Sequence, residues 1–180
     1  MTALWRALSA RYDSAALQPF AWPPEPASAW PALRAWCLAG WPETPLAVAF
    51  HEPGDLTWAR VATLGLELDG SVLLHHSRGS LDRLLLRARV KWQDLRPGAL
   101  RPATAIWDSG FVPREAQALT ALARFQPRRP SFIVLQGFNA DELVHALRGL
   151  RGRGKEFSLP VRVLILSDAQ PPAPCGYIPA

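Results

Sequence analysis

The residues best suited to chemistry follow short apolar runs that are typical of buried strands. Ligands of a parallel sheet bind just beyond the carboxyl ends of its strands. Acids, imidazoles and hydroxyls at such positions permit acid–base catalysis or nucleophilic attack. Five apolar runs are followed by polar residues, most of them of these kinds, namely His51 and Glu52, His75, His76 and Ser77, Asp108 and Ser109, Gln136 and Asn139, and Ser167 and Asp168. An enzyme that uses Glu52, His75 and Asp108 is therefore one hypothesis.

These candidates also have purely structural interpretations. Neighbouring residues on a strand face opposite sides, so His75 and His76 cannot present both rings to one metal ion without ligands from elsewhere. Asp108, Ser109 and Gly110 are typical of a turn that caps the following helix, and we favour that interpretation. We therefore assign no catalytic, cofactor-binding or metal-binding residue from the sequence.

The turn after the first apolar run disfavours nucleotide binding. A phosphate-binding loop is rich in glycine, leads into a helix and carries a lysine followed by serine or threonine. Residues 51–55 read His-Glu-Pro-Gly-Asp, with one glycine, two acids and no lysine. The acids would repel phosphate. We therefore expect no cofactor and no hydrolysis of ATP or GTP.

Apolar runs that alternate with helical segments predict an α/β fold with a doubly wound, mostly parallel sheet of five strands. Parallel strands need crossover connections of this length, and helices supply them. The expected strands are 46–50, 71–76, 104–107, 131–136 and 161–166. The expected helices are 55–65, ended by Gly65, then 81–95, capped by Ser80, then 113–125, and a last one that begins at Asn139.

Two of these segments carry further expectations. Asp69 and Gly70 would also suit the turn of a hairpin over 62–76, which is the alternative to a helix followed by the second strand. The last helix has Glu142 as the capping-box partner of Asn139. Its buried stripe would be Leu143, Leu147 and Leu150.

The segment 81–95 has the spacing of an amphipathic helix. Its apolar stripe consists of Leu81, Leu84, Leu85, Ala88, Trp92 and Leu95, whereas its opposite face carries Arg83, Arg87 and Lys91. We expect the apolar stripe to pack on the sheet. Leu85→Ala would then lower the free energy of unfolding by about 2–5 kcal/mol.

The first part of the chain differs from the rest in composition. Residues 1–45 hold five of the eight tryptophans and seven of the 18 prolines. Three of these tryptophans are followed directly by proline. Such pairs mark turns, because a residue before proline is pushed towards extended geometry. We expect helices at 2–17 and 28–38 with an irregular linker at 19–26. The predicted organisation is a helical extension over 1–44 that packs on the core, a core domain over 45–168 and a proline-rich tail over 169–180.

Charge is unevenly distributed along the chain. Residues 1–77 hold four basic and seven acidic residues, a net −3, whereas residues 78–180 hold 16 basic and eight acidic residues, a net +8. A one-sided basic surface attracts anionic partners. Arg83, Arg87 and Lys91 would follow a phosphate backbone from one helix face. Nucleic-acid binding through the basic surface of residues 78–155 is therefore a second hypothesis.

Other patterns bear on the location of the protein. No apolar run approaches the roughly 18 residues that a membrane helix needs, and the first residues lack the pattern of a secretory signal. Cys37 and Cys175 do not have a metal-ligand spacing. We therefore expect a cytoplasmic protein.

The order of the central segments resembles RecA-type domains. A strand leads through a Pro-x-Gly turn into a helix with Leu64, Gly65 and Leu66, and then into a strand at 72–74. An arginine-rich helix from Leu81, a strand that ends at Trp107 and Asp108, and a helix before 132–135 continue the likeness. Residues 45–137 most resemble the relatives without a phosphate-binding loop, which include the SOS cell-division inhibitor family. That resemblance implies a protein that binds a protein target and does no chemistry.

The leading hypothesis is a non-enzymatic protein-interaction or regulatory module with a degenerate nucleotide-binding-type fold, acting in a larger cytoplasmic assembly. Tryptophan and arginine are enriched at interface hot spots. Trp22 and Trp41 are therefore candidate partner-binding residues, together with Arg83, Arg87 and Lys91. The sequence leaves the oligomeric state open.

Overall fold

The computed structural model describes residues 16–24, 28, 30–39, 44–55, 57–76, 79, 84–85, 88, 105–168 and 176–177. The strands are β1 (Leu46–His51), β2 (Asp108–Phe111), β3 (Ser131–Gln136), β4 (Val161–Leu166) and β5 (Gly176–Tyr177). The helices are α2 (Pro31–Leu38), α3 (Thr57–Leu68), α4 (Ser71–His76), α6 (Ala116–Ala123) and α7 (Ala140–Arg153), with a 3-10 turn, η2, at Gly154–Glu156.

The strands form one parallel sheet in the order β2-β3-β4-β1-β5. β4 lies between β3 and β1 and pairs with both along its whole length, whereas β5 adds only a two-residue pairing beside Ala49 and Phe50. The predicted α/β class with a parallel sheet is confirmed. Three predicted strands are confirmed as β1, β3 and β4. The predicted set of five is not confirmed, because the strands expected at 71–76 and 104–107 do not correspond to β2 or β5.

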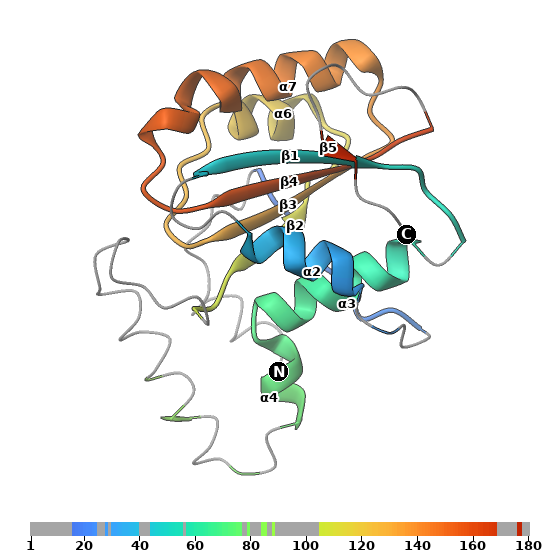
Figure 1. Cartoon of the computed structure of the whole chain (residues 1–180), viewed down its shortest axis with the longest axis vertical. Coiled ribbons are helices and arrows are strands. Elements are labelled where there is room, and N and C mark those ends of the chain that lie inside the picture. Colours follow the sequence, from blue (N-terminus) through green and yellow to red (C-terminus); the bar gives the residue numbers. More distant parts are fainter. Residues whose placement is uncertain are drawn as a thin grey trace.

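Helices cover both faces of the sheet. Phe132 and Val134 of β3 belong to an apolar cluster with α2 and α3 side chains. Ile133 and Leu135 of the same strand belong to a second cluster with α6 and α7 side chains. Figure 1 shows α6 and α7 over one face and α2 and α3 against the other. Burial on both faces explains why β3 is a continuous apolar run and does not alternate with polar residues.

The start of α7 follows the sequence prediction. Asn139 Oδ1 accepts a 2.9 Å hydrogen bond from Glu142 N, and Glu142 Oε2 accepts one of 2.9 Å from Asn139 N. This capping box is confirmed, and the predicted stripe of Leu143, Leu147 and Leu150 is buried. α6, in contrast, is shorter at both ends than the helix predicted over 113–125.

α3 does not end at Gly65 as predicted. Gly65 lies inside the helix, where the ring of Phe20 occupies the space that a Cβ atom would fill. The helix ends before Gly70, whose φ of 77° lies in the left-handed region that glycine adopts without strain. Gly65 is therefore needed for close packing, and Gly70 is the helix-ending residue.

Residues 71–76 are helical, so the predicted second strand and the alternative hairpin are both wrong. Asp69 Oδ1 accepts a 2.7 Å hydrogen bond from Ser71 N, and Leu74 N donates one of 3.1 Å to Gly70 O. The Asp69 side chain thus starts a new helix directly after Gly70. α4 buries none of its residues and extends away from the sheet (Figure 1).

β2 begins after the predicted strand at 104–107 ends. Trp107 N donates a 3.0 Å hydrogen bond to Leu68 O, so Trp107 is bonded to the end of α3. Gln18 forms an antiparallel bridge with Phe111 at the other end of β2. A Cβ atom at Gly110 would collide with the carbonyl oxygen of Gln18. The small residue therefore admits the N-terminal segment to the edge of the sheet.

The described part of the N-terminal region packs on the sheet. α2 begins at Pro31 with Trp30 as its N-cap residue and not at Ser28. Residues 19–24 contain no helix or strand, as predicted for the linker. Of the predicted first helix, only residues 16 and 17 are described, and neither is helical. Phe20, Trp30 and Leu33 are buried in the cluster beneath the sheet.

Arg162 of β4 holds the residues that follow α2. Its guanidinium is fully buried and donates hydrogen bonds to the carbonyl oxygens of Cys37, Ala39 and Thr44 at 3.1, 2.8 and 2.9 Å. Burial raises the pKa of the Cys37 thiol to about 12, against the opposing charge of Arg162. The Cys37 thiol therefore stays protonated and unreactive at neutral pH.

The predicted packing of segment 81–95 is wrong in its described residues. Leu84, Leu85 and Ala88 are helical, but all three are exposed, with exposed fractions of 64% for Leu84 and 59% for Leu85. The physical reason is that helices already cover both faces of the sheet, and α4 leads the chain away from it (Figure 1).

We therefore expect Leu85→Ala to change the free energy of unfolding by less than about 0.5 kcal/mol. Leu147→Ala in α7 is the matched control, because Leu147 is buried, and it should cost about 2–5 kcal/mol. Urea denaturation of both variants measures the difference. Equal losses would mean that Leu85 is buried after all.

Candidate protein-interaction surface

The carboxyl ends of β1, β3 and β4 meet at the edge where the sequence places a ligand site. His51 is buried there, and its ring meets the Trp30 ring edge-on with centroids 4.3 Å apart. Its carbonyl oxygen accepts a 3.3 Å hydrogen bond from Ser167 N. Glu52, the next residue, is exposed. His51 is therefore packed into the fold, whereas Glu52 faces solvent, as do Gln136, Asn139 and Asp168 at the same edge.

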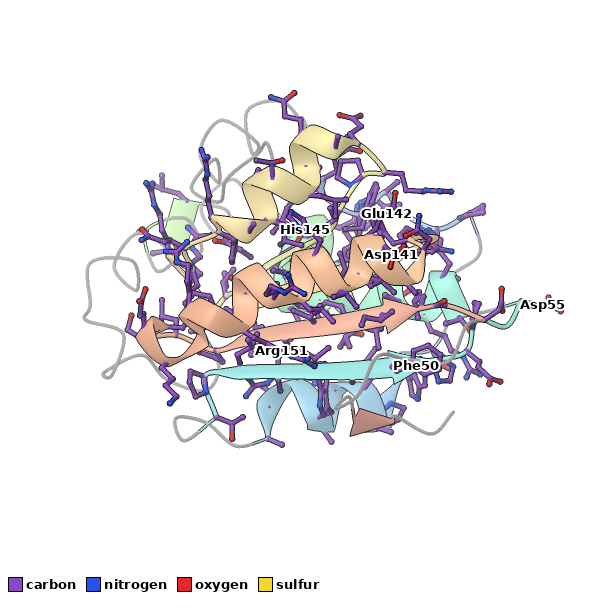
Figure 2. The ribbon with its side chains drawn as sticks, turned by 90° about the horizontal axis from the view of Figure 1, so that it is seen from above. Phe50, Asp55, Asp141, Glu142, His145 and Arg151 are labelled. Atoms are coloured by element: carbon purple, nitrogen blue, oxygen red, sulfur yellow. The ribbon has the colours of Figure 1, made fainter. Side chains whose placement is uncertain are left out.

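Acidic and capping groups dominate this edge. Asp141 and Glu142 lie at the first turn of α7, and Asp55 lies beyond the end of β1 at the same end of the molecule (Figure 2). Gly54 N donates a 2.7 Å hydrogen bond to Thr57 Oγ1 in the turn after β1. The acids in the first turn of α7 disfavour a phosphate group there, and the Arg114 side chain lies near Gly137, just before the helix.

Asp108 lies at the opposite edge of the sheet. It begins β2 and is in register with Ser131 at the start of β3, so the interpretation of Asp108, Ser109 and Gly110 as a turn is wrong. A strand rises about 3.3 Å per residue, which places Asp108 roughly 20 Å from Glu52 along the strand direction. The structure therefore does not bring Glu52, His75 and Asp108 together as a catalytic set.

Long-range partners explain the burial of these polar residues. Arg129 Nη1 lies 3.3 Å from Asp108 Oδ1, and both side chains are almost fully buried. The Ser109 hydroxyl donates a 2.5 Å hydrogen bond to Gly65 O in α3. The start of β2 is thus stabilised by an ion pair and a hydrogen bond to residues far away in the sequence.

Asp69, between α3 and α4, is a titratable group that the sequence prediction missed. Burial raises the pKa of Asp69 to about 7, and the charge of Asp108 adds to this increase, whereas hydrogen bonds from Ser71 oppose it. The Asp-Gly-Ser run at 69–71 is the one signal in the sequence. It is equally typical of a hairpin turn.

Replacing Asp69 with asparagine should flatten the dependence of stability on pH. The pKa of Asp69 in the folded state lies above its ordinary value of 3.8, so the native state holds the proton more tightly. The stability that this provides is fully present below about pH 4 and is lost as the pH rises to about 7.

A pKa difference of this size corresponds to at most about 4 kcal/mol, and the solvent contact that Asp69 retains reduces that value. We expect Asp69→Asn to exceed the wild type in stability by about 1–3 kcal/mol at pH 8 and to match it near pH 4. Urea unfolding at both pH values provides the measurement. Parallel pH profiles for the two proteins would show that Asp69 does not control this loss.

The exposed side chains at α4 form the candidate interaction surface, which we call the α4 surface and define as Trp22, Leu73, His75 and His76. The rings of Trp22 and His75 have centroids 5.0 Å apart, and those of His75 and His76 lie 5.7 Å apart. Trp22 is 50% exposed and Leu73 is 58% exposed. An exposed tryptophan ring packed beside an exposed helix is typical of protein-binding sites.

The α4 surface contains one of the predicted partner-binding residues, Trp22. The other four, Arg83, Arg87, Lys91 and Trp41, lie outside the described residues. Leu73 escaped the sequence prediction because its segment has the length and composition of a buried strand.

In the part of the chain that the structure describes, no group of three or more His, Cys, Asp or Glu side chains could hold a metal ion. None of the described helices combines the length and the apolar character that crossing a membrane requires. Searches of protein-family models, curated proteins and solved structures found no match to this chain.

Proposed function

We propose that this protein is a non-enzymatic interaction module that binds another protein through the α4 surface. The observation that carries the proposal is the exposure of two apolar side chains at α4, a helix that buries none of its residues. Leu73 belongs to α4, and Trp22 lies beside it. Tryptophan is among the residues most enriched at interface hot spots, where a large ring fills a pocket of the partner.

The residues after α4 support a protein partner over a nucleic acid. Leu84 and Leu85 are exposed, and residues 78–101 hold seven basic and two acidic residues, a net charge of +5. Exposed leucines add little to phosphate binding, whereas an apolar partner surface rimmed by acids would accept both the leucines and the charge. We therefore propose a partner of that kind.

The proposal includes a doubly wound, degenerate nucleotide-binding-type fold like that of RecA-type domains, and a regulatory role in a larger cytoplasmic assembly. Helices on both faces of the sheet support the fold. Residues 72–74, which the RecA likeness expects as a strand, are helical, and this is a departure from that likeness.

Affinity purification of the full-length protein from its native cells tests the proposal. The variants are Trp22→Ala and Leu73→Asp, and the control is Val144→Asp, because Val144 is 39% exposed and belongs to α7, which lies on the other side of the sheet from α4 (Figure 1). We expect a protein that is recovered with the wild type and the control. Either surface variant should reduce its recovery at least about tenfold.

A salt titration of the recovered complex separates the two classes of partner. A protein held mainly by the apolar side chains of the α4 surface should lose affinity only modestly as salt screens the charges at the rim, whereas a nucleic acid should dissociate steeply with salt and depend on Arg83 and Arg87. Recovery of nucleic acid with that behaviour would replace the proposed function by the alternative. Recovery of no protein that depends on Trp22 or Leu73 would also refute it.

A further inference from the structure

A group of cations lies where α6 and α7 end, at the amino edge of the sheet. Residues 123–130 lead from α6 into β3, and residues 148–157 lead from α7 into β4. The two segments together hold seven basic residues and one acid, Glu156. Arg129 is buried against Asp108. The other six basic residues, which we call the basic edge, are exposed or half-buried: Arg124, Arg128, Arg148, Arg151, Arg153 and Lys155.

Close packing of α6 on α7 brings these cations together. A Cβ atom at Gly149 would lie 2.8 Å from Ala123 Cβ, so the two helices approach closely near their last turns. Arg124 and Arg148 are the chain neighbours of these two residues, and both are exposed. Two segments that are distant in sequence therefore present their positive charges on one packed surface.

The basic edge has a span that suits a DNA backbone. A Cβ atom at Gly154 would lie 3.1 Å from Leu46 Cδ2, which places Lys155 beside the start of β1, whereas Arg128 lies just before β3. β4 lies between β1 and β3, and neighbouring strands are about 4.8 Å apart, so the cations span roughly 10 Å. One strand of a DNA duplex carries a phosphate about every 3.4 Å along the axis, hence about three over this span.

Helix dipoles explain only part of the basic edge. Cations in the last turn of a helix complement its dipole, which accounts for Arg151 and Arg153, and Arg153 Nε also lies 3.7 Å from Glu156 Oε2. Arg128 and Lys155 lie outside α6 and α7. Like charges gathered in this way repel one another in the free protein, and an anionic partner relieves that repulsion.

Charge is polarised along α7. Asp141 and Glu142 lie at its first turn, and Asp55 lies at the same end of the molecule (Figure 2). The basic edge lies at the opposite end of the helix. Such a polarity steers a polyanion towards the amino edge of the sheet.

The side chains of the basic edge favour a DNA duplex over other anions. Single strands are held largely by bases that stack on aromatic rings, and protein partners need exposed apolar anchors. The large apolar side chains of the two segments, Phe125, Leu150 and Phe157, are buried. RNA duplexes are recognised partly through their 2′-hydroxyl groups, whereas five of the six side chains here are guanidinium groups, which match phosphate.

We propose that the basic edge binds the phosphate backbone of double-stranded DNA without reading its sequence. This is a further function that does not depend on the proposed one. The basic edge belongs to the helices on one face of the sheet, whereas α4 follows α3 on the other face (Figure 1).

Fluorescence anisotropy of a labelled DNA duplex of about 20 base pairs, titrated with the full-length protein, tests the inference. Between about 50 and 200 mM salt, the logarithm of the association constant should fall against the logarithm of the salt concentration with a slope of about −3. Arg124→Ala combined with Arg148→Ala should reduce the slope by about two and weaken binding at least about tenfold. Lysine at both positions should restore most of the affinity, because the charge is kept.

Arg34→Ala combined with Arg114→Ala is the matched control. Both residues are exposed and lie away from the basic edge, and the pair removes the same net charge. We expect this control to change the affinity by less than about threefold, because distant exposed charges are screened by salt. Equal weakening by the two double variants would overturn the inference, since net charge alone would then explain binding.

Other probes complete the test. Absence of duplex binding at about 50 mM salt would overturn the inference, and so would equal or tighter binding of an RNA duplex or of polyglutamate with matched charge. Binding that depends on Arg83 and Arg87 but not on Arg124 and Arg148 would also overturn it. Trp22→Ala should leave the affinity for the duplex unchanged, so failure of the proposed function and failure of this inference are distinguishable.

Discussion

Arg162→Met should lower the free energy of unfolding by about 3–5 kcal/mol, because hydrogen bonds from a charged donor contribute about 1.5–3 kcal/mol each. Arg162 is fully buried and donates to the carbonyl oxygens of Cys37, Ala39 and Thr44. Methionine keeps much of the apolar volume but donates no hydrogen bond. The residues that follow α2 would then lose their attachment to β4.

Urea denaturation of Arg162→Met tests this expectation against Arg148→Met. Arg148 is exposed on α7, so its replacement should change stability by less than about 0.5 kcal/mol. Hydrogen exchange should also show faster exchange in α2 than in α7 for Arg162→Met. Similar stability losses in the two variants would mean that the contacts of Arg162 do not hold the N-terminal region.

Arg129→Met should be the second severe substitution, with a loss of about 3–5 kcal/mol, because it removes the cation from a buried ion pair. Arg129 Nη1 lies 3.3 Å from Asp108 Oδ1, and both side chains are almost fully buried. The remaining carboxylate would stay at the start of β2 without this compensating charge. The double variant Asp108→Asn and Arg129→Met removes both charges and should recover a substantial part of the loss.

A double-mutant cycle in urea isolates the interaction of Asp108 with Arg129. We expect the double variant to be more stable than Arg129→Met alone. If the two single losses simply add, the ion pair does not explain why Asp108 is a strand residue, and our account of β2 would have to be abandoned.

The parts of the fold that the sequence predicts well depend on local patterns. Residues 132–135 of β3 and 163–166 of β4 are unbroken apolar runs, as expected of strands that are buried on both faces. The capping box of Asn139 and Glu142 joins residues three positions apart, so it can be recognised without the fold. Such elements need no information about distant partners.

The elements that were predicted wrongly depend on distant or ambiguous contacts. Asp108 and Ser109 look like turn residues, and they become strand residues because Arg129 and Gly65 satisfy their side chains. Asp108 therefore begins a strand and does not follow one, so it lies at the amino edge of the sheet and not at the carboxyl edge. It is consequently too far from Glu52 to form the predicted catalytic set. The apolar run at 71–76 suits a strand or a helix, and the hydrogen bond between Asp69 and Ser71 starts a helix.

The candidate site was only partly predictable for the same reason. Trp22 stands out in the sequence beside Pro23, but nothing in the sequence places it against His75. The exposure of Leu73 follows from the direction of α4, which depends on the joint at Asp69 and Gly70. Tertiary structure therefore assembles the α4 surface from segments that look unrelated in sequence.

Site-specific photocrosslinking in intact native cells tests the central claim most directly. A photoreactive amino acid at position 73 would lie on the α4 surface, and the same group at position 144 would lie on α7, where Val144 is 39% exposed against 58% for Leu73. We predict that position 73 captures a discrete protein, that position 144 does not, and that Trp22→Ala weakens the capture. Crosslinks from position 144 but not from position 73, or none from either, would contradict the assignment of the α4 surface as a protein-binding site.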